Sequence, residues 1–148
     1  MKKILYKKIL VAVDGSEQAN KALDHALDVA EKYMATEVRL VHVVQRAASF
    51  LYTGEGPEPP WLGALYDNLE KSGKLVLEDA EKRAKGKKLK TKISTKLLHG
   101  QPADEIVNYA KNEKFDLIII GCRGLSGVRE FILGSVSGKV VNNATVPV

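Results

Sequence analysis

The sequence predicts an α/β fold, a doubly wound parallel sheet with helices on both faces. Short apolar runs alternate along the chain with longer amphipathic stretches, which is the pattern of strand–helix–strand units. The joints from each helix to the next strand are short, as expected for right-handed parallel crossovers. Residues 117–120 are four consecutive apolar residues, three of them Ile, as in a strand that is buried on both faces.

The first part of the chain predicts a strand, a helix and a second strand. Residues 9–13 form the first apolar run and residues 38–44 the second. Between them, apolar residues recur at steps of three and four, which predicts a helix over 17–33 with Ser16 as its N-cap. Residues 45–60 are rich in Gly and Pro, so we expect an irregular segment there that acts as a lid or a contact surface.

The alternation continues in the second part. We expect a helix over 61–85, with Gly73 as its weak point, and a strand over 92–98. Pro102 predicts the first turn of a third helix, the strand at 117–120 follows, and a fourth helix begins near Ser135. The helix over 61–85 has an inner apolar stripe formed by Leu62, Leu65, Leu69, Val76, Leu77 and Ala80.

Composition indicates one domain over residues 1–148 and limits its chemistry. The single cysteine, Cys122, excludes an intramolecular disulfide framework and a multi-cysteine zinc site, and it fits a reducing compartment. We find neither a signal peptide nor an apolar stretch long enough to span a membrane, so we expect a cytoplasmic protein.

The formal net charge is +5, and much of the excess lies in residues 82–92. A nucleic-acid patch is one interpretation, but no aromatic residues are interleaved there for base stacking. Lysines at the end of a helix also complement its dipole. We therefore interpret this stretch as a solvated face and expect no nucleic-acid partner.

Glycines behind the fourth strand predict a phosphate site. Gly121 and Gly124 follow the strand, and Gly134-Ser135 stand at the entrance of the next helix. Glycines let backbone N–H groups approach an anion, and a helix N-terminus adds a positive dipole end. Ser135 could cap the helix or donate its hydroxyl to a ligand. Spacing alone leaves a plain long turn as the alternative.

The pattern Gly-x2-Gly-x9-Gly-Ser, together with Ile-Leu-Val-Ala-Val-Asp-Gly-Ser at 9–16 and Val-His-Val-Val at 41–44, resembles the ATP-binding branch of the universal stress protein (UspA-like) family. The resemblance covers nearly the whole chain. It implies a Rossmann-like, adenine nucleotide alpha-hydrolase-like fold with five strands in the order 3-2-1-4-5. Strands one and four then lie side by side where the winding reverses, and a ligand crevice opens beyond their carboxyl ends.

The same resemblance assigns residues to an ATP site. It implies that Asp14 and its neighbours line the ribose and adenine end, and that Val43 offers backbone hydrogen bonds to adenine. Arg123 could reach a terminal phosphate or point to solvent. The hydroxyls of Ser135 and Ser137 would add donors for the phosphates. The full set of expected binding residues is Ala12, Val13, Asp14, Val43, Ile120, Gly121, Arg123, Gly124, Gly134, Ser135, Val136 and Ser137.

The sequence assigns no catalytic residue and no direct metal ligand. The loops of P-loop NTPases and of dinucleotide dehydrogenases are absent. His42 is interpreted as a core or rim residue, and His99 has no evident partner. Cys122 is interpreted as a small space-filling side chain. We therefore expect an ATP-binding regulatory module of the stress response, with Mg²⁺ held by the phosphates or by Asp14 through water. The alternatives are a slow ATPase and an interaction protein with a vestigial nucleotide site.

Residues 145–148 match the start of the fifth strand in the resembling family, whose members commonly form dimers through that strand. Because the sequence given stops after the first residues of this strand, the segment over 45–61 is the other candidate contact. We expect an isologous homodimer, together with a protein partner that the sequence does not identify.

Overall fold

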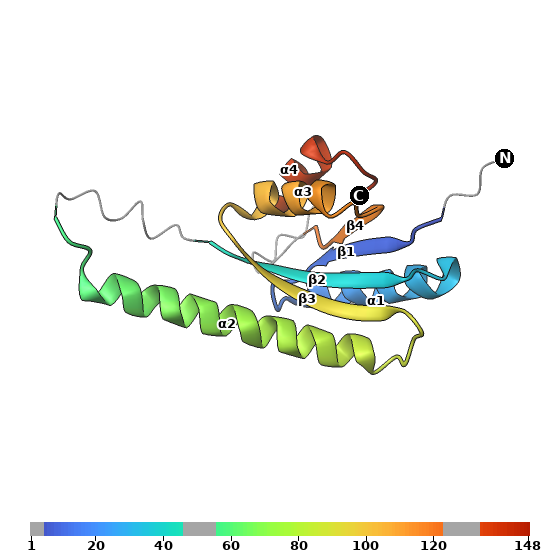
Figure 1. Cartoon of the computed structure of the whole chain (residues 1–148), viewed down its shortest axis with the longest axis horizontal. Helices are drawn as coiled ribbons and strands as arrows, with labels where there is room; N and C mark the ends of the chain where they lie inside the picture. The colour runs from blue at the N-terminus through green and yellow to red at the C-terminus, as the bar shows by residue number, and fades with distance from the viewer. Residues whose placement is uncertain (1–4, 46–55, 123–133) are drawn as a thin grey trace.

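A four-stranded parallel sheet forms the centre of the molecule (Figure 1). The computed structural model describes residues 5–45, 56–122 and 134–148. The strands lie in the order β3-β2-β1-β4, so β1 and β4 are neighbours as expected. Their bounds are β1 Lys8–Ala12, β2 Glu37–Val44, β3 Lys92–His99 and β4 Leu117–Ile120.

Four helices cover the two faces of the sheet. On one face lie α1 (Glu17–Tyr33) and α2 (Pro60–Lys85), and on the other lie α3 (Pro102–Asn112) and α4 (Ser135–Asn143) (Figure 1). The expected N-cap of α1 is confirmed, since the Ser16 hydroxyl accepts a hydrogen bond from the Ala19 N–H at 3.1 Å. Pro102 occupies the first turn of α3, where a missing N–H costs nothing.

The expected fifth strand is not present among the described residues. After α4 the chain returns beside β4, and the Ile118 N–H donates to the Pro147 carbonyl at 2.9 Å. Pro147 has no N–H and cannot donate a hydrogen bond in return, so this short segment does not form a ladder with β4. The sheet of the described residues therefore has four strands, and the expectation of five is wrong.

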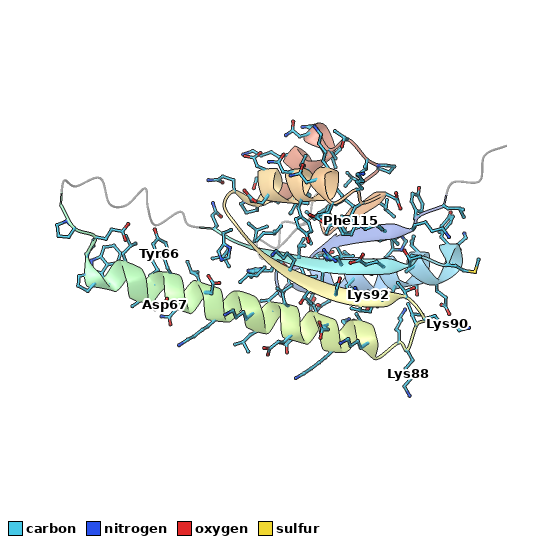
Figure 2. The ribbon with its side chains drawn as sticks, in the orientation of Figure 1. Tyr66, Asp67, Lys88, Lys90, Lys92 and Phe115 are labelled. Atoms are coloured by element: carbon cyan, nitrogen blue, oxygen red, sulfur yellow. The ribbon has the colours of Figure 1, made fainter. Side chains whose placement is uncertain are left out.

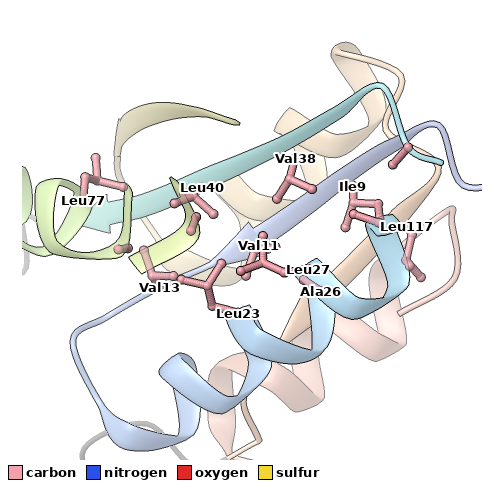
Figure 3. Packing of buried hydrophobic residues seen from close by; sticks show 14 residues of the cluster. Ile9, Val11, Val13, Leu23, Ala26, Leu27, Val38, Leu40, Leu77 and Leu117 are labelled. Atoms are coloured by element: carbon pink, nitrogen blue, oxygen red, sulfur yellow. The ribbon is translucent and has the colours of Figure 1, made fainter. Parts of the chain in front are cut away.

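The two faces of the sheet bury separate hydrophobic clusters. Beneath α1 and α2, residues such as Leu23, Leu27 and Leu77 pack against the strands (Figure 3). Beneath α3 and α4, Leu10, Ile106 and Phe115 belong to a second cluster. Leu40 and Val41 are neighbours in β2 and are both fully buried, because their side chains point to opposite covered faces.

Helix α2 extends well beyond the sheet (Figure 1). Its inner stripe is only partly as expected: Leu62, Leu77 and Ala80 are buried, whereas Leu65 is exposed. Gly73 is buried in the middle of α2, where a β-carbon would lie 2.9 Å from atoms of both His42 and Leu97. This glycine therefore allows close contact between α2 and strands β2 and β3.

Acidic residues of α1 pair with part of the basic stretch. Arg83 donates to the Asp24 carboxylate, and Lys87 lies 2.7 Å from an oxygen of Asp28. The Arg83 hydrogen bond lowers the pKa of the exposed Asp24 carboxyl. Figure 2 shows Lys88 and Lys90 in the connection between α2 and β3, and Lys92 at the start of β3. The ion pairs of Arg83 with Asp24 and of Lys87 with Asp28 join the end of α2 and the residues just after it to α1.

Candidate functional site

A cavity of about 310 Å³ opens beyond the carboxyl ends of β1, β2 and β4. The strand order explains its position. From β1 the chain winds outward to β2 and β3 on one side, whereas β4 lies on the other side of β1. The connections at this point leave in opposite directions, so the helices separate and a crevice remains between them.

Asp14 enters the cavity from the turn between β1 and α1. Its Oδ1 accepts a hydrogen bond from the Ser16 N–H at 2.9 Å. Gly15, between them, has φ +83°, a conformation that glycine adopts without steric strain. The turn thus fixes the Asp14 side chain through one carboxylate oxygen and leaves the rest of its acceptor capacity for a ligand. Asp14 is the one acidic residue among the described residues that line the cavity.

Gly121 leaves the end of β4 directly against the first turn of α1. A β-carbon at Gly121 would stand 3.0 Å from the backbone carbon of Gln18. At Gly134 a β-carbon would stand 2.9 Å from the Cys122 carbonyl oxygen. Both glycines therefore have a packing reason within the protein itself, a reason that the sequence did not reveal.

A backbone hydrogen bond joins Cys122 and Gly134, the described residues on either side of 123–133. The Gly134 N–H donates to the Cys122 carbonyl at 2.8 Å, so the N-terminus of α4 is fixed beside the end of β4. The first bond of α4 then runs from the Gly138 N–H to the Gly134 carbonyl at 2.8 Å. The intervening N–H groups, from Ser135 to Ser137, belong to the first turn of the helix and have no partner in the helical ladder.

The two serines of α4 differ from each other. Gly134, rather than Ser135, is the N-cap, and among the described residues no side chain caps this helix. Ser135 is exposed at the cavity. Ser137 is buried, and its hydroxyl lies 3.3 Å from the Cys122 carbonyl and 3.2 Å from the Gly134 carbonyl. The Ser137 hydroxyl thus has acceptors within the protein, and its expected role as a donor to the phosphates stays a prediction.

One wall of the cavity is apolar. Val41 and Val43 of β2, together with Pro102 and Ile106 of α3, line this wall. Sequence reasoning named Val43 but missed the others, although residues 41 and 43 share one face of a strand and thereby gave a usable signal. His42 also lines the cavity, and its Nδ1 lies 2.8 Å from the Val13 carbonyl oxygen.

The structure brings together every described residue of the expected set. Residues from β1, β2, β4 and α4 converge on the same cavity, although they are far apart in the sequence: Ala12, Val13, Asp14, Val43, Ile120, Gly121, Gly134, Ser135, Val136 and Ser137. Arg123 and Gly124 lie outside the described residues. The cavity also contacts Ser16, Ala19 and Cys122, which the sequence did not assign to it.

The remaining candidates lie elsewhere. His99, for which the sequence suggested no partner, has its Nε2 2.9 Å from an oxygen of Glu70. Across the described residues, no group of three or more His, Cys, Asp or Glu side chains is placed to hold a metal ion. Within the same residues, no helix is both long and apolar enough to cross a membrane.

Comparison with known proteins identifies the family. The universal stress protein family profile matches residues 5–148. The chain belongs to the universal stress protein family. Universal stress protein YxiE of Bacillus subtilis is 37% identical over 148 residues, a match that covers 97% of each chain.

Solved structures of this family share the fold. Protein MJ0577, a universal stress protein of Methanocaldococcus jannaschii, has a TM-score of 0.80 at 30% identity, and the match covers 97% of this chain and 94% of that one. A universal stress protein in complex with cAMP has a TM-score of 0.67 at 24% identity, over 97% and 94% of the two chains. A family protein of Arabidopsis thaliana with AMP bound has a TM-score of 0.62 at 21% identity, over 95% and 88%. The similarity to the cAMP complex and to the AMP-bound protein shows that this chain has the same fold as they have.

Proposed function

We propose that this universal stress protein binds adenine nucleotides, with ATP as its ligand, and acts as a nucleotide-dependent regulatory module of the stress response in the cytoplasm. The observation that carries the proposal is a single cavity lined both by Asp14 and by the first turn of α4. An acidic acceptor beside free helical N–H donors suits a molecule that has hydroxyls at one end and phosphates at the other.

Each part of the nucleotide has a chemically suitable wall. The apolar side chains of Val41, Val43 and Ile106 suit the flat face of a base. The Asp14 carboxylate suits ribose hydroxyls, which are hydrogen-bond donors. The backbone N–H groups of Ser135 and Val136, at the positive end of the α4 dipole, suit phosphate oxygens. Arg123 and Gly124 belong to the proposed phosphate end on the basis of the sequence.

Magnesium would accompany the phosphates in this proposal. Mg²⁺ prefers oxygen ligands and keeps several waters. In nucleotide sites it is usually bound by one or two carboxylates of the protein and by the phosphates of the nucleotide. Asp14 is the carboxylate available at the cavity among the described residues. The protein would thus hold the ion through the bound nucleotide, with Asp14 contributing through water.

The regulatory role follows from how a bound nucleotide changes the molecule. Its contacts would connect the β1–α1 turn with the start of α4, two segments that line the cavity from distant parts of the sequence. A ligand that binds one arrangement of these segments better than another shifts the population toward that arrangement. A protein partner could then distinguish the bound form from the free form.

The decisive experiment identifies the ligand and measures its effect. The purified protein is denatured, and any released nucleotide is identified by mass spectrometry. In parallel, its melting temperature is measured with and without Mg-ATP. At about a hundred times the dissociation constant, binding adds about 2.7 kcal/mol to the stability of the folded state. For a domain of this size we expect a rise of roughly 5 to 11 °C. No released nucleotide, no melting shift at millimolar Mg-ATP and no calorimetric heat would together contradict the proposal.

We also propose that the protein forms a homodimer with an isologous interface along the edge of the sheet beyond β4. Val148 follows Pro147, whose carbonyl accepts from the Ile118 N–H of β4, and it is exposed by nearly half of its surface, as is Val141 of α4. Apolar side chains next to a sheet edge favour pairing with another chain. A two-fold axis at this edge would bring the same residues of both copies together.

A further inference from the structure

The cavity wall includes a histidine to which no role in ligand binding has been given. His42 lies in β2 between Val41 and Val43, and it is half-buried beside the cavity. Its Nδ1 stands 2.8 Å from the Val13 carbonyl oxygen. A carbonyl oxygen can only accept, so Nδ1 carries the hydrogen and donates it to Val13.

This contact stands where the backbone ladder between β1 and β2 should continue. The ladder ends with the Val13 N–H, which donates to the Val41 carbonyl at 2.9 Å. In parallel strands, the next bond would run from the Val43 N–H to the Val13 carbonyl. The register of β1 with β2 instead stops at Ala12 opposite Val41. The His42 imidazole therefore takes the place of the Val43 N–H as the donor to Val13.

We propose that His42 is a positioning residue of the ligand site: its Nδ1–H binds the Val13 carbonyl and thereby leaves the Val43 N–H outside the ladder, available to a ligand. The substitution of a side-chain donor for a backbone donor has two effects. The Val13 carbonyl keeps a hydrogen-bond partner, as a buried carbonyl requires. Val43 lines the apolar wall of the cavity, and its backbone N–H is left without a partner in the ladder.

The surrounding structure fixes the ring in this position. Gly73 of α2 lies against His42 so closely that a β-carbon would come within 2.9 Å of its Cδ2. Val76, one turn further along α2, lies 3.5 Å from where a β-carbon of Gly15 would be. The same helix therefore packs against both the imidazole and the β1–α1 turn.

The inference rests on the proposed function only for its ligand, and the chain offers a set of substitutions that tests it. His42→Asn keeps an N–H donor near the position of Nδ1. His42→Gln places its polar atoms farther out, near the position of Nε2. His42→Leu has similar bulk and no donor. Because only Asn preserves the bond to Val13, the comparison separates an indirect positioning role from direct contact between the ring and the ligand.

The first measurement does not involve a nucleotide. Amide hydrogen exchange of Val43 is compared with that of Val41, which lies within the ladder and serves as the internal reference. We expect Val43 to exchange at least about tenfold faster than Val41 in the original protein and in His42→Asn. In His42→Leu we expect the ladder to close and the difference to disappear. Val43 exchange as slow as that of Val41 in the original protein would overturn the inference.

The second measurement is the affinity for ATP by calorimetry. His42→Leu and His42→Gln should each weaken binding about three- to tenfold, the effect of one hydrogen bond that the ligand must now displace. His42→Asn should remain within about twofold of the original protein. Full affinity in His42→Leu, or retention by Gln with loss by Asn, would refute a positioning role. If the original protein binds no nucleotide, the proposed function fails, whereas the exchange measurement still decides the inference.

Discussion

Gly73 and His42 are in direct contact across the interface between α2 and β2, where a β-carbon on the glycine would lie 2.9 Å from Cδ2 of the imidazole. The contact places a helix on one face of the sheet against a residue that lines the cavity at the end of the sheet. A substitution in α2 at this contact should therefore alter the cavity, whereas a substitution in the exposed part of the same helix should not.

Gly73→Ala tests this contact, with Gly63→Ala in the same helix as its control. A β-carbon at Gly63 meets nothing within 4 Å, so alanine there should stabilise the protein by about 0.5 to 1 kcal/mol through helix propensity. Alanine at Gly73 should instead destabilise it by about 1 to 3 kcal/mol, because His42 and Leu97 must move. Urea unfolding measures both free energies. Equal effects of the two substitutions would show that α2 is free to adjust.

Asp14→Asn tests the proposed role of the carboxylate. Asn keeps a carbonyl oxygen that can accept from the Ser16 N–H, so the turn should remain and the melting temperature should change little. The charge is lost, and we expect the affinity for Mg-ATP to fall about tenfold, which is about 1.4 kcal/mol. Calorimetry checks the affinity. Asp14→Ala is the comparison, since it removes the acceptor as well and should also reduce stability.

Glu37→Gln tests a polar network beneath α3. The Glu37 carboxylate accepts from the Ser94 hydroxyl at 2.9 Å and also pairs with Arg39, whose guanidinium donates to Tyr109. Burial alone would raise the pKa of Glu37, but the Ser94 hydrogen bond and Arg39 outweigh it and lower the pKa below its ordinary value of 4.5. The folded state therefore holds the charged form more strongly than the unfolded state does.

The sign of the pH effect follows from this lowered pKa. The stabilisation by Glu37 is fully present above its unfolded pKa, and it is lost as the pH falls through the lower pKa of the folded state. At pH 7, Glu37→Gln should be less stable by about 1 to 2 kcal/mol. The difference from the original protein should be constant above about pH 5.5 and should shrink below pH 4.5. Denaturant titrations at a series of pH values measure it, and a difference that does not change with pH would exclude this network as its source.

The proposed dimer is tested by replacing an apolar residue of its expected interface with a charged one. Light scattering at micromolar concentration should report about twice the mass of one chain. Val141→Lys places a charge at an exposed apolar position of α4, the helix before the segment that lies beside β4, and should shift the protein to monomer. Leu75→Lys is the matched control, because Leu75 is also an exposed apolar residue but belongs to α2, on the other face. A dimer that survives Val141→Lys and dissociates with Leu75→Lys would place the interface on α2.

The sequence allowed most of the fold to be predicted because the signals were local. Apolar runs located all four strands, with the fourth at residues 117–120 as expected, and the spacing of apolar residues located α1 at its observed bounds. The convergence of Asp14 and Gly121 on one cavity was expected from the strand order that the family resemblance implied, which places their strands side by side. The prediction of a fifth strand was wrong, because the match of residues 145–148 to the start of a strand does not show how many hydrogen bonds they can form with β4.

The details of the site that were missed depend on contacts between distant parts of the chain. The bond from His42 to Val13 joins residues 29 positions apart and involves a side chain in place of a backbone group. The inward direction of the Ser137 hydroxyl depends on the Cys122 carbonyl, on the other side of the segment 123–133. The need for glycine at Gly121 arises from the backbone of α1. No periodicity or spacing in the sequence carries such information.

The two hydrophobic clusters on opposite faces of the sheet have an evolutionary consequence. The cluster beneath α3 contributes Val41 and Ile106 to the cavity wall, whereas Leu23, Leu27 and Ala30 of the other cluster lie away from it. Substitutions at well-separated sites act almost independently of one another. Buried positions of α1 such as Leu23, Leu27 and Ala30 can therefore accumulate changes that adapt the protein to a new temperature, while Val41 and Ile106 on the opposite face remain free to change which small molecule the crevice accepts.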